Sequence, residues 1–369
     1  MAQQEVLTSH PFNNVTENIF SKIGANLHRR QNHPICIIKE AIYDFFNSQR
    51  PGTYAKFDEL HPVVSAAANF DEMLVPAGHV SRSPNDTYYI DADTVLRCHT
   101  SAHQAATLRQ GHPAFLITGD VYRRDSIDQS HYPVFHQMEG LRVLEPDEYG
   151  GDPAAGAAAA ERELKELLEG LAQHLFGSGT ECRWVDAYFP FTTPSFELEI
   201  FFNGQWLEVL GCGVVEQQIL DKNGFEGRRA WAFGLGLERL AMVLFQIPDI
   251  RLFWAEDQRF LKQFRAGDLR TAFKPYSKYP ACFKDVSFWL PETGFTENNL
   301  CEVVRGAAGD LVEAVELIDA FTHPKTGRTS NCFRISYRSM ERSLNDEEIN
   351  AIQAQVREEL TAKLGAELR

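Results

Sequence analysis

The stretch GDVYRRD at residues 119–125, followed by VFHQMEG at residues 134–140, decides how this chain is interpreted. Two apolar runs flank a charged turn, a pattern that predicts a β-hairpin. On the second run, Phe135, Gln137 and Glu139 alternate and therefore share one face of the strand. Such a face is a poor core stripe, because a buried glutamate must be paired. It predicts the polar floor of a pocket.

The charged turn carries Arg123 and Arg124, followed by Asp125. A solvent-exposed, ion-paired hairpin would explain these residues and would add little stability. The alternative is an anion site, because a guanidinium is a planar fork that matches phosphate oxygens with two hydrogen bonds. The polar face of the second strand favours the anion site.

A second informative stretch is AFGLGLERL at residues 232–240. Gly234 and Gly236 allow another strand or a ligand to approach the backbone closely. The pattern then predicts a helix over residues 235–245, with Arg239 at an otherwise apolar start that needs an anionic partner or solvent. Its neighbour Glu238 points elsewhere on a helix, so a phosphate is the better partner.

A polar cluster, HTSAHQ at residues 99–104, lies where a strand gives way to a helix. Two interpretations stay open. Ser101 caps the helix and the histidines lie on the surface, or these side chains ring the mouth of a pocket. The spacing of His99 and His103 does not by itself indicate a zinc site.

The aromatic run YFPF at residues 188–191 would usually belong to a core, yet Pro190 interrupts a strand and indicates an edge or a bulge. Phe189 and Phe191 could then project into a cavity. Most glutamates on strands face solvent, but Glu208 is the first candidate for binding Mg²⁺ through oxygen.

The composition is that of an ordinary soluble globular protein, with 369 residues, 44% hydrophobic residues and a net charge of −15. The charge disfavours a protein that coats nucleic acid nonspecifically, so any RNA contact needs local basic surface. The seven cysteines are scattered without a C-x-x-C, which favours free thiols in a reducing compartment. No signal peptide, Arg-rich presequence or membrane span is expected.

The order of elements predicts an α+β fold. We expect an N-terminal arm at residues 1–32, a first domain at 33–263 and a linker at 264–279. Antiparallel strands with separate helices should build the first domain. Its Gly- and Ala-rich segment at residues 150–160 is predicted to be a surface loop.

Residues 280–369 are predicted to form a smaller second domain. Strand, helix, two strands and a helix follow in turn, and a short strand is possible after Gly365, which is a ferredoxin-like order. The last helix should begin after Asn345, with Glu348 three residues later as in a capping box.

Taken together, these stretches resemble class II aminoacyl-tRNA synthetases, and in particular the single-chain phenylalanyl-tRNA synthetases of mitochondria. The resemblance runs from about residue 32 to the C-terminus. It is carried by phrases such as VLRCHTSAHQ, GDVYRRDSID, HYPVFHQMEG, RWVDAYFPFT, WLEVLGCGVVEQQ, WAFGLGLERLAM, PDIRLFW and YSKYP at residues 276–280. Residues 78–82 match the first class II motif only loosely.

The resemblance implies a class II catalytic domain with an antiparallel sheet, followed by a ferredoxin-fold anticodon-binding domain. The implied reaction activates phenylalanine with ATP and Mg²⁺ and transfers it to the 2′-hydroxyl of the terminal adenosine of tRNA(Phe). The relatives are monomers of the mitochondrial matrix, and a plastid or dual address stays open.

The same resemblance implies roles for individual residues. Arg123, Arg239 and His131 would be catalytic. Phenylalanine would meet His99, Ser101, Gln104, Gln137, Glu139, Phe189, Phe191 and Ala232, with Gln137 and Glu139 on its ammonium. ATP would meet Arg123, Asp125, His131, Phe135, Glu208 and Arg239.

The segment between His323 and Ser343 is basic, with Glu341 as its one acidic residue. It is either a solvated hairpin or, given the resemblance, a surface that faces tRNA. Its basic residues are Lys325, Arg328, Arg334, Arg338 and Arg342.

Two rival functions remain. A relative that charges an anionic amino acid is disfavoured by Phe189 and Phe191. A catalytically silent RNA-binding paralogue is disfavoured by the presence of Arg123, Glu139 and Arg239.

Overall fold

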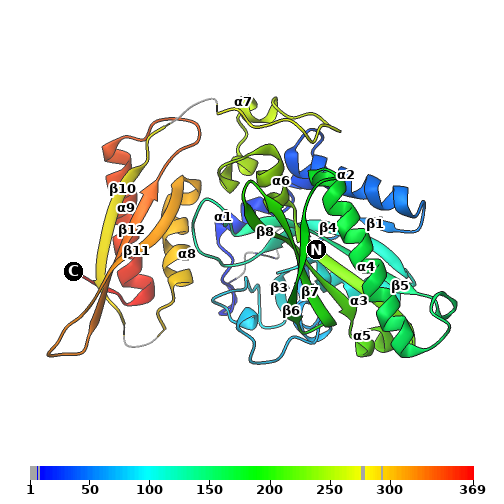
Figure 1. Cartoon of the computed structure of the whole chain (residues 1–369). Coiled ribbons are helices and arrows are strands. Elements are labelled where there is room, and N and C mark those ends of the chain that lie inside the picture. The colour runs from blue at the N-terminus through cyan, green and yellow to red at the C-terminus, as the bar shows by residue number, and fades with distance from the viewer. Residues whose placement is uncertain (1–5, 7–8, 276–278, 292–293) are drawn as a thin grey trace.

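A mixed seven-stranded sheet forms the larger part of the molecule (Figure 1). This computed structural model describes residue 6 and residues 9–275, 279–291 and 294–369. The strands follow the order β1-β4-β5-β9-β8-β7-β6. Their bounds are Ala55–Phe57 for β1, Ala114–Tyr122 for β4, Val134–Leu144 for β5, Cys182–Phe189 for β6, Thr192–Phe202 for β7, Gln205–Val215 for β8 and Arg229–Gly236 for β9.

The predicted antiparallel sheet is confirmed, with one parallel pair at its edge. β1 pairs in parallel with β4, whereas the other neighbours are antiparallel. A parallel pair needs a long crossover. The connection from β1 to β4 supplies it and contains a two-stranded sheet of β2 (Val63–Ser65) and β3 (Thr94–Leu96), followed by the short helix α3 (Gln104–Arg109).

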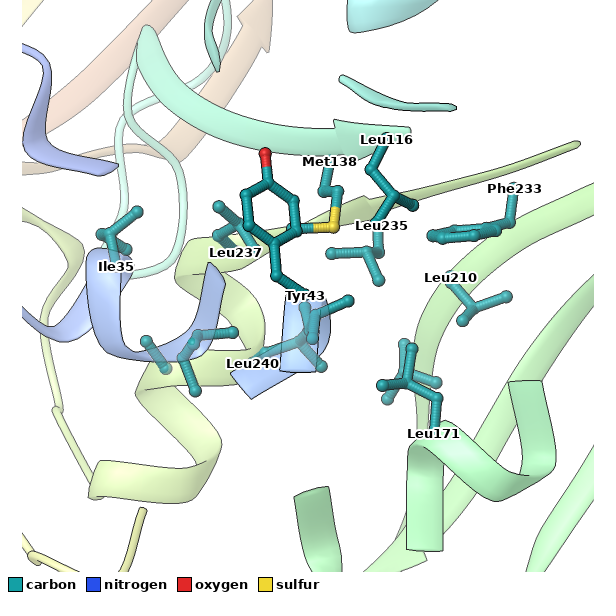
Figure 2. Close-up of a cluster of buried hydrophobic side chains, with 14 of the residues drawn as sticks. Ile35, Tyr43, Leu116, Met138, Leu171, Leu210, Phe233, Leu235, Leu237 and Leu240 are labelled. Carbon is teal, nitrogen blue, oxygen red and sulfur yellow. The ribbon is translucent and has the colours of Figure 1, made fainter. Parts of the chain in front are cut away.

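Three helices cover one face of the large sheet, namely α2 (Pro34–Gln49), α4 (Pro153–Phe176) and α6 (Leu237–Phe245). Figure 2 shows their apolar side chains meeting those of the strands. Ile35 and Tyr43 come from α2, Leu171 from α4 and Leu240 from α6, and they face Leu116, Met138, Leu210, Phe233 and Leu235. Burial of this face fixes which side of each strand points away from the helices.

The opposite face of the sheet is only partly filled. A second apolar cluster, which includes Phe70, Ile117, Leu141, Leu220 and Ala230, covers one end of it. Leu141 lies on the same side of β5 as Glu139, because strand residues alternate. The other end of this face therefore remains for polar residues.

The prediction of a loop over residues 150–160 is wrong, because α4 begins at Pro153. Asp152 caps this helix by accepting a hydrogen bond from the backbone N–H of Ala154, and Pro153 occupies the first turn, where its missing N–H costs nothing. The alanines that follow have the highest helix propensity of all residues. The helix predicted from residue 235 likewise begins later, at Leu237, since β9 continues to Gly236.

The smaller part of the molecule is a four-stranded sheet in the order β11-β12-β10-β13, packed against α8 (Glu297–Ala308) and α9 (Asp346–Leu364) (Figure 1). Its strands are β10 (Cys282–Trp289), β11 (Val312–Thr322), β12 (Thr329–Tyr337) and β13 (Glu367–Leu368). Asn345 caps α9, since its side chain accepts from the N–H of Glu348 at 2.8 Å. The predicted ferredoxin-like order is confirmed.

The segments predicted as arm and linker pack on the larger part where they are described. Helix α1 (Glu17–Lys22) buries Ile19, and Phe264 is buried in the same core. Residues 1–5, 7, 8 and 276–278 of these two segments lie outside the described residues, so the domain boundaries remain predictions. Among the described helices, none has the length and apolar composition to cross a membrane. The seven cysteines are free.

Candidate active site

A cavity of about 540 Å³ opens on the sheet face opposite α2, α4 and α6. Every residue that the sequence predicted to contact an amino acid or a nucleotide lines it. These residues are His99, Ser101, Gln104, Arg123, Asp125, His131, Phe135, Gln137, Glu139, Phe189, Phe191, Glu208, Ala232 and Arg239. They come from β5, β6, β8 and β9, from the start of α3 and the turn before it, from α6 and from the loops beside these elements.

Strand β5 supplies the floor of the cavity with Phe135, Gln137 and Glu139. Its intervening residue His136 points into the opposite layer. There the backbone N–H of His136 donates to Glu238 Oε2 and its Nδ1 lies 2.7 Å from Glu238 Oε1. The carboxylate of Glu238, which also lines the cavity, is thereby paired with His136 rather than with its neighbour Arg239.

Glu139 is almost completely buried where it lines the cavity, with 1% of the residue exposed. Gln104 Nε2 donates to Glu139 Oε1 at 3.1 Å. Two buried acceptors, Glu139 Oε2 and Gln104 Oε1, find no hydrogen-bond donor among the described residues. Burial raises the pKa of Glu139 to about 7, and hydrogen bonding by Ser101 and Gln104 opposes that rise. This corner is built to accept hydrogen bonds from a cation.

The interpretation of Ser101 as a helix cap is wrong. The short 3₁₀ turn Thr100–His103 has His99 at its N-cap position, and neither that turn nor α3 receives a side-chain cap. His99 Nε2 lies 2.9 Å from the carbonyl oxygen of Asn69, and its Nδ1 has no partner among the described residues. Burial, and then the charge of Arg123, lowers the pKa of His99 to about 4. The imidazole is therefore neutral and presents a free nitrogen.

Arg123 brings a guanidinium to the cavity, where the charge of Asp125 acts on it but does not form an ion pair with it. Its Nε donates to the carbonyl oxygen of Cys98 at 2.8 Å, and its Cζ lies 5.2 Å from the centre of the Phe135 ring. Within the described residues it forms no ion pair. Burial lowers the pKa of this arginine. Nε and the ring fix the direction of the group and leave its outer N–H donors for an anion.

Phe189 and Phe191 form the apolar wall. Strand β6, at the edge of the sheet, ends at Phe189, and the turn at Pro190 brings the two ring centres to 5.9 Å with an angle of 14° between the planes. Gly211 makes room for this wall, since a Cβ there would lie 2.7 Å from the Phe189 ring. An aromatic or apolar group is the ligand that such a wall fits.

Two glycines of the second motif border the empty space itself. A Cβ built on Gly234 or on Gly236 would meet no atom within 4 Å, although both residues line the cavity. Ala232, two residues earlier on the same face of β9, is buried beside them. This strand end therefore limits the cavity with backbone rather than side chains.

Arg239 lies at the mouth, where its Nη1 is 3.2 Å from Glu208 Oε2 and both side chains are about half exposed. Glu197 also lines the cavity, and burial together with the charges of Glu208 and Glu199 raises its pKa. No cluster of three or more His, Cys, Asp or Glu in the described residues is arranged to hold a metal. Mg²⁺ needs only one or two carboxylates when a substrate supplies phosphates, so the repelling pair of Glu197 and Glu208 fits it.

Some lining residues were not predicted from the sequence. His79 and Ser81 fall in the segment that matches the first class II motif only loosely, and Val75 precedes them without any motif. Tyr188, 78% exposed, lies at the rim. Of these residues, only Tyr188 belongs to a stretch that the sequence singled out, the aromatic run at residues 188–191. The cavity wall was predicted from Phe189 and Phe191 in that run.

The five basic residues predicted to face RNA lie on the smaller part, where the fold brings acidic residues from outside their segment next to them. Carboxylates from other elements pair with four of them. The pairs are Arg328 with Glu367 at 2.5 Å, Arg334 with Asp285 at 2.8 Å, Arg338 with Glu313 at 3.3 Å and Arg342 with Glu348 at 2.5 Å. Sequence spacing could not show these partners.

The sequence matches two families, tRNA synthetases class II core domain (F) over residues 16–264 and ferredoxin-fold anticodon binding domain over residues 277–369. It is 64% identical to the chloroplastic/mitochondrial phenylalanine–tRNA ligase of Arabidopsis thaliana, over 97% of this chain and 83% of the relative. The chain belongs to the phenylalanine–tRNA ligases of class II.

More distant members of this family also match over almost the whole chain. The mitochondrial enzyme of Mus musculus is 50% identical over 96% of this chain and 86% of its own length. That of Saccharomyces cerevisiae is 39% identical over 96% of this chain and 92% of its own length. The predicted family, the α+β fold with a ferredoxin-fold second domain and the organellar address are thereby confirmed, and ATP is a substrate of the class.

Proposed function

We propose that this chain activates phenylalanine with ATP and transfers it to the 2′-hydroxyl of the terminal adenosine of tRNA(Phe). The observation that carries the proposal is a pair of buried acceptors, Glu139 Oε2 and Gln104 Oε1, for which the described part of the chain supplies no donor. They lie in a cavity walled by Phe189 and Phe191. An ammonium group offers three N–H donors, and a benzyl group suits the two rings. One ligand that carries both groups is phenylalanine.

The first step joins the carboxylate of phenylalanine to the α-phosphorus of ATP and releases pyrophosphate. With Glu139 and Gln137 on the ammonium, the amino acid is held so that its carboxylate points toward Arg123. The outer N–H donors of Arg123 bind the α-phosphate and stabilise the charge that builds up there. The protein contributes mainly positioning and fixed charge.

Further residues hold the nucleotide. Phe135 would stack on one face of the adenine ring, and the guanidinium of Arg239 would lie on the other face or at the outer phosphates. His131 and Asp125 also line the cavity and would contact the nucleotide. Glu208, with Glu197 beside it, would hold Mg²⁺, which neutralises phosphate charge. That Glu208 already pairs with Arg239 means that a bound nucleotide rearranges this pair.

In the second step, the 2′-hydroxyl of the terminal adenosine attacks the adenylate carbonyl and AMP leaves. The cavity mouth between Tyr188 and Arg239 is the side from which this end of the tRNA enters. A monomeric enzyme is expected, because the single-chain relatives that the sequence resembles are monomers. Lys325, Arg328, Arg334, Arg338 and Arg342 would contact the tRNA body from the second domain.

ATP–pyrophosphate exchange with each amino acid in turn tests this proposal. Phenylalanine should support exchange far better than the others, including phosphoserine. Exchange driven by another amino acid would reassign the substrate. Exchange with none of them, together with tRNA binding, would identify a silent RNA-binding paralogue instead.

A further inference from the structure

The loop at residues 124–132 is part of the first domain and also packs against the second. Asp125, Ser130 and His131 line the cavity of the first domain, at the end that the proposed function assigns to the nucleotide. Ile127, between them, is 6% exposed and is part of the hydrophobic core of the second domain, beside residues such as Val315. A core that includes one residue of a neighbouring domain's loop fixes that loop through packing.

Arg305 of α8 adds polar contacts to the same loop. Its Nη2 donates to the carbonyl oxygens of Asp125 and, at 2.9 Å, of Ser126. Its Nη1 lies 2.6 Å from Glu302 Oε1, and Glu302 also accepts from the hydroxyl of Tyr88 at 2.8 Å. Both the arginine and its carboxylate partner have side chains only 8% exposed. The guanidinium thus ties two successive loop carbonyls to a buried anchor.

Other residues of the second domain contact the loop on either side. Asn298 Nδ2 donates to the carbonyl oxygen of Arg124 at 3.1 Å, and the N–H of Val315 donates to that of Ile127 at 3.1 Å. Towards the end of the loop, the Tyr132 hydroxyl donates to Asp310 Oδ1 at 2.6 Å. These contacts hold the loop backbone from Arg124 to Tyr132.

We propose that Arg305 is a positioning residue for ATP, which acts by holding the 124–132 loop in the shape that brings Asp125 and His131 to the nucleotide. The second domain then sets the affinity of the first domain for ATP while it leaves the phenylalanine pocket alone. This inference rests on the proposed function, because it assigns that end of the cavity to the nucleotide. Within the part of the chain that the structure describes, no residue proposed to bind phenylalanine forms a hydrogen bond or an ion pair with the second domain, which separates the two substrates.

The test compares wild type with Arg305→Ala in ATP–pyrophosphate exchange. We expect the KM for ATP to rise about 3- to 30-fold, the range that corresponds to typical coupling between distant groups, and the KM for phenylalanine to change less than about twofold. Arg357→Ala, an exposed arginine on α9 of the same domain, is the matched control. It should leave both constants unchanged.

Calorimetric titration with ATP alone provides a second readout that does not depend on the amino acid. If wild type shows no phenylalanine-dependent exchange, the proposed function fails and this titration still decides the inference. If Arg305→Ala does not fold, Asn298→Ala takes its place with the same criterion. ATP binding as in wild type in the folded variant, or an equal rise of both KM values, overturns the proposal.

Discussion

Arg123 in the cavity and the arginines on the basic surface of the second domain are held in opposite ways. In the cavity, Arg123 forms no ion pair within the described residues and is held by a carbonyl group and an aromatic ring. On the second domain, Arg328 and Arg334 are each paired with a carboxylate. An unpaired guanidinium that is already oriented can bind an anion directly and stabilise its charge. An exposed ion pair is weak, so its arginine can exchange the carboxylate for a phosphate.

The comparison predicts that the cavity arginine matters most. The Arg123→Ala substitution should lower the rate of ATP–pyrophosphate exchange about 10²–10³-fold, as expected for the loss of one fixed donor that stabilises charge. Exchange kinetics at saturating substrates provide the measurement. Arg228→Ala removes an exposed ion pair with Glu145 outside the cavity and should change the rate less than about twofold. Near-normal exchange by Arg123→Ala would remove the distinction between the two regions.

The cavity should also respond to pH where the exposed pairs do not. Burial raises the pKa of Glu139 to about 7, so its carboxylate is charged above that pH and protonated below it. The KM for phenylalanine should therefore rise about tenfold between pH 8 and pH 6. His99, with a pKa lowered to about 4, stays neutral throughout this range.

Glu139→Gln supplies the control for this titration. Its KM should be high and nearly independent of pH from 6 to 8, because the amide does not ionise. If the KM of the wild type did not change between pH 6 and pH 8, the carboxylate of Glu139 would already be charged at pH 6. Burial would then not raise the pKa of Glu139.

The smallest effects belong to the second domain. Lys325 has no ion pair within the described residues, so Lys325→Ala should reduce the slope of log Kd for tRNA(Phe) against log salt by about 1. Asp285→Asn frees Arg334 from its carboxylate and should tighten binding by a few-fold, since exposed pairs contribute about 0–1 kcal/mol. Filter binding at several salt concentrations measures both. Weaker binding by Asp285→Asn would show that the pair itself orders the RNA surface.

The floor of the site could be predicted from sequence because it depends on a local rule. Alternation along a strand was sufficient to place Phe135, Gln137 and Glu139 on one face, and β5 places them there. The turn at Pro190 was equally local. At such positions the local backbone conformation determines the direction of a side chain, and tertiary packing does not change it.

What could not be predicted depends on partners distant in the sequence. The carboxylates opposite Arg328 and Arg334 come from β13 and β10, and Ile127 packs in the core of a domain that begins far along the chain. The alanines after Pro153 were assigned to a loop by composition, although their propensity and the Asp152 cap indicated a helix. That error was avoidable.

The glycine pair at the end of β9 has a consequence for inherited variation. Alanine at position 234 or 236 would meet no neighbouring atom, so either variant should fold and be as thermally stable as the original protein. Its added methyl group would nevertheless reduce the volume available to the substrates. Screens that rank substitutions by thermal denaturation or cellular abundance would pass both changes as harmless. Only an assay of aminoacylation would register the defect.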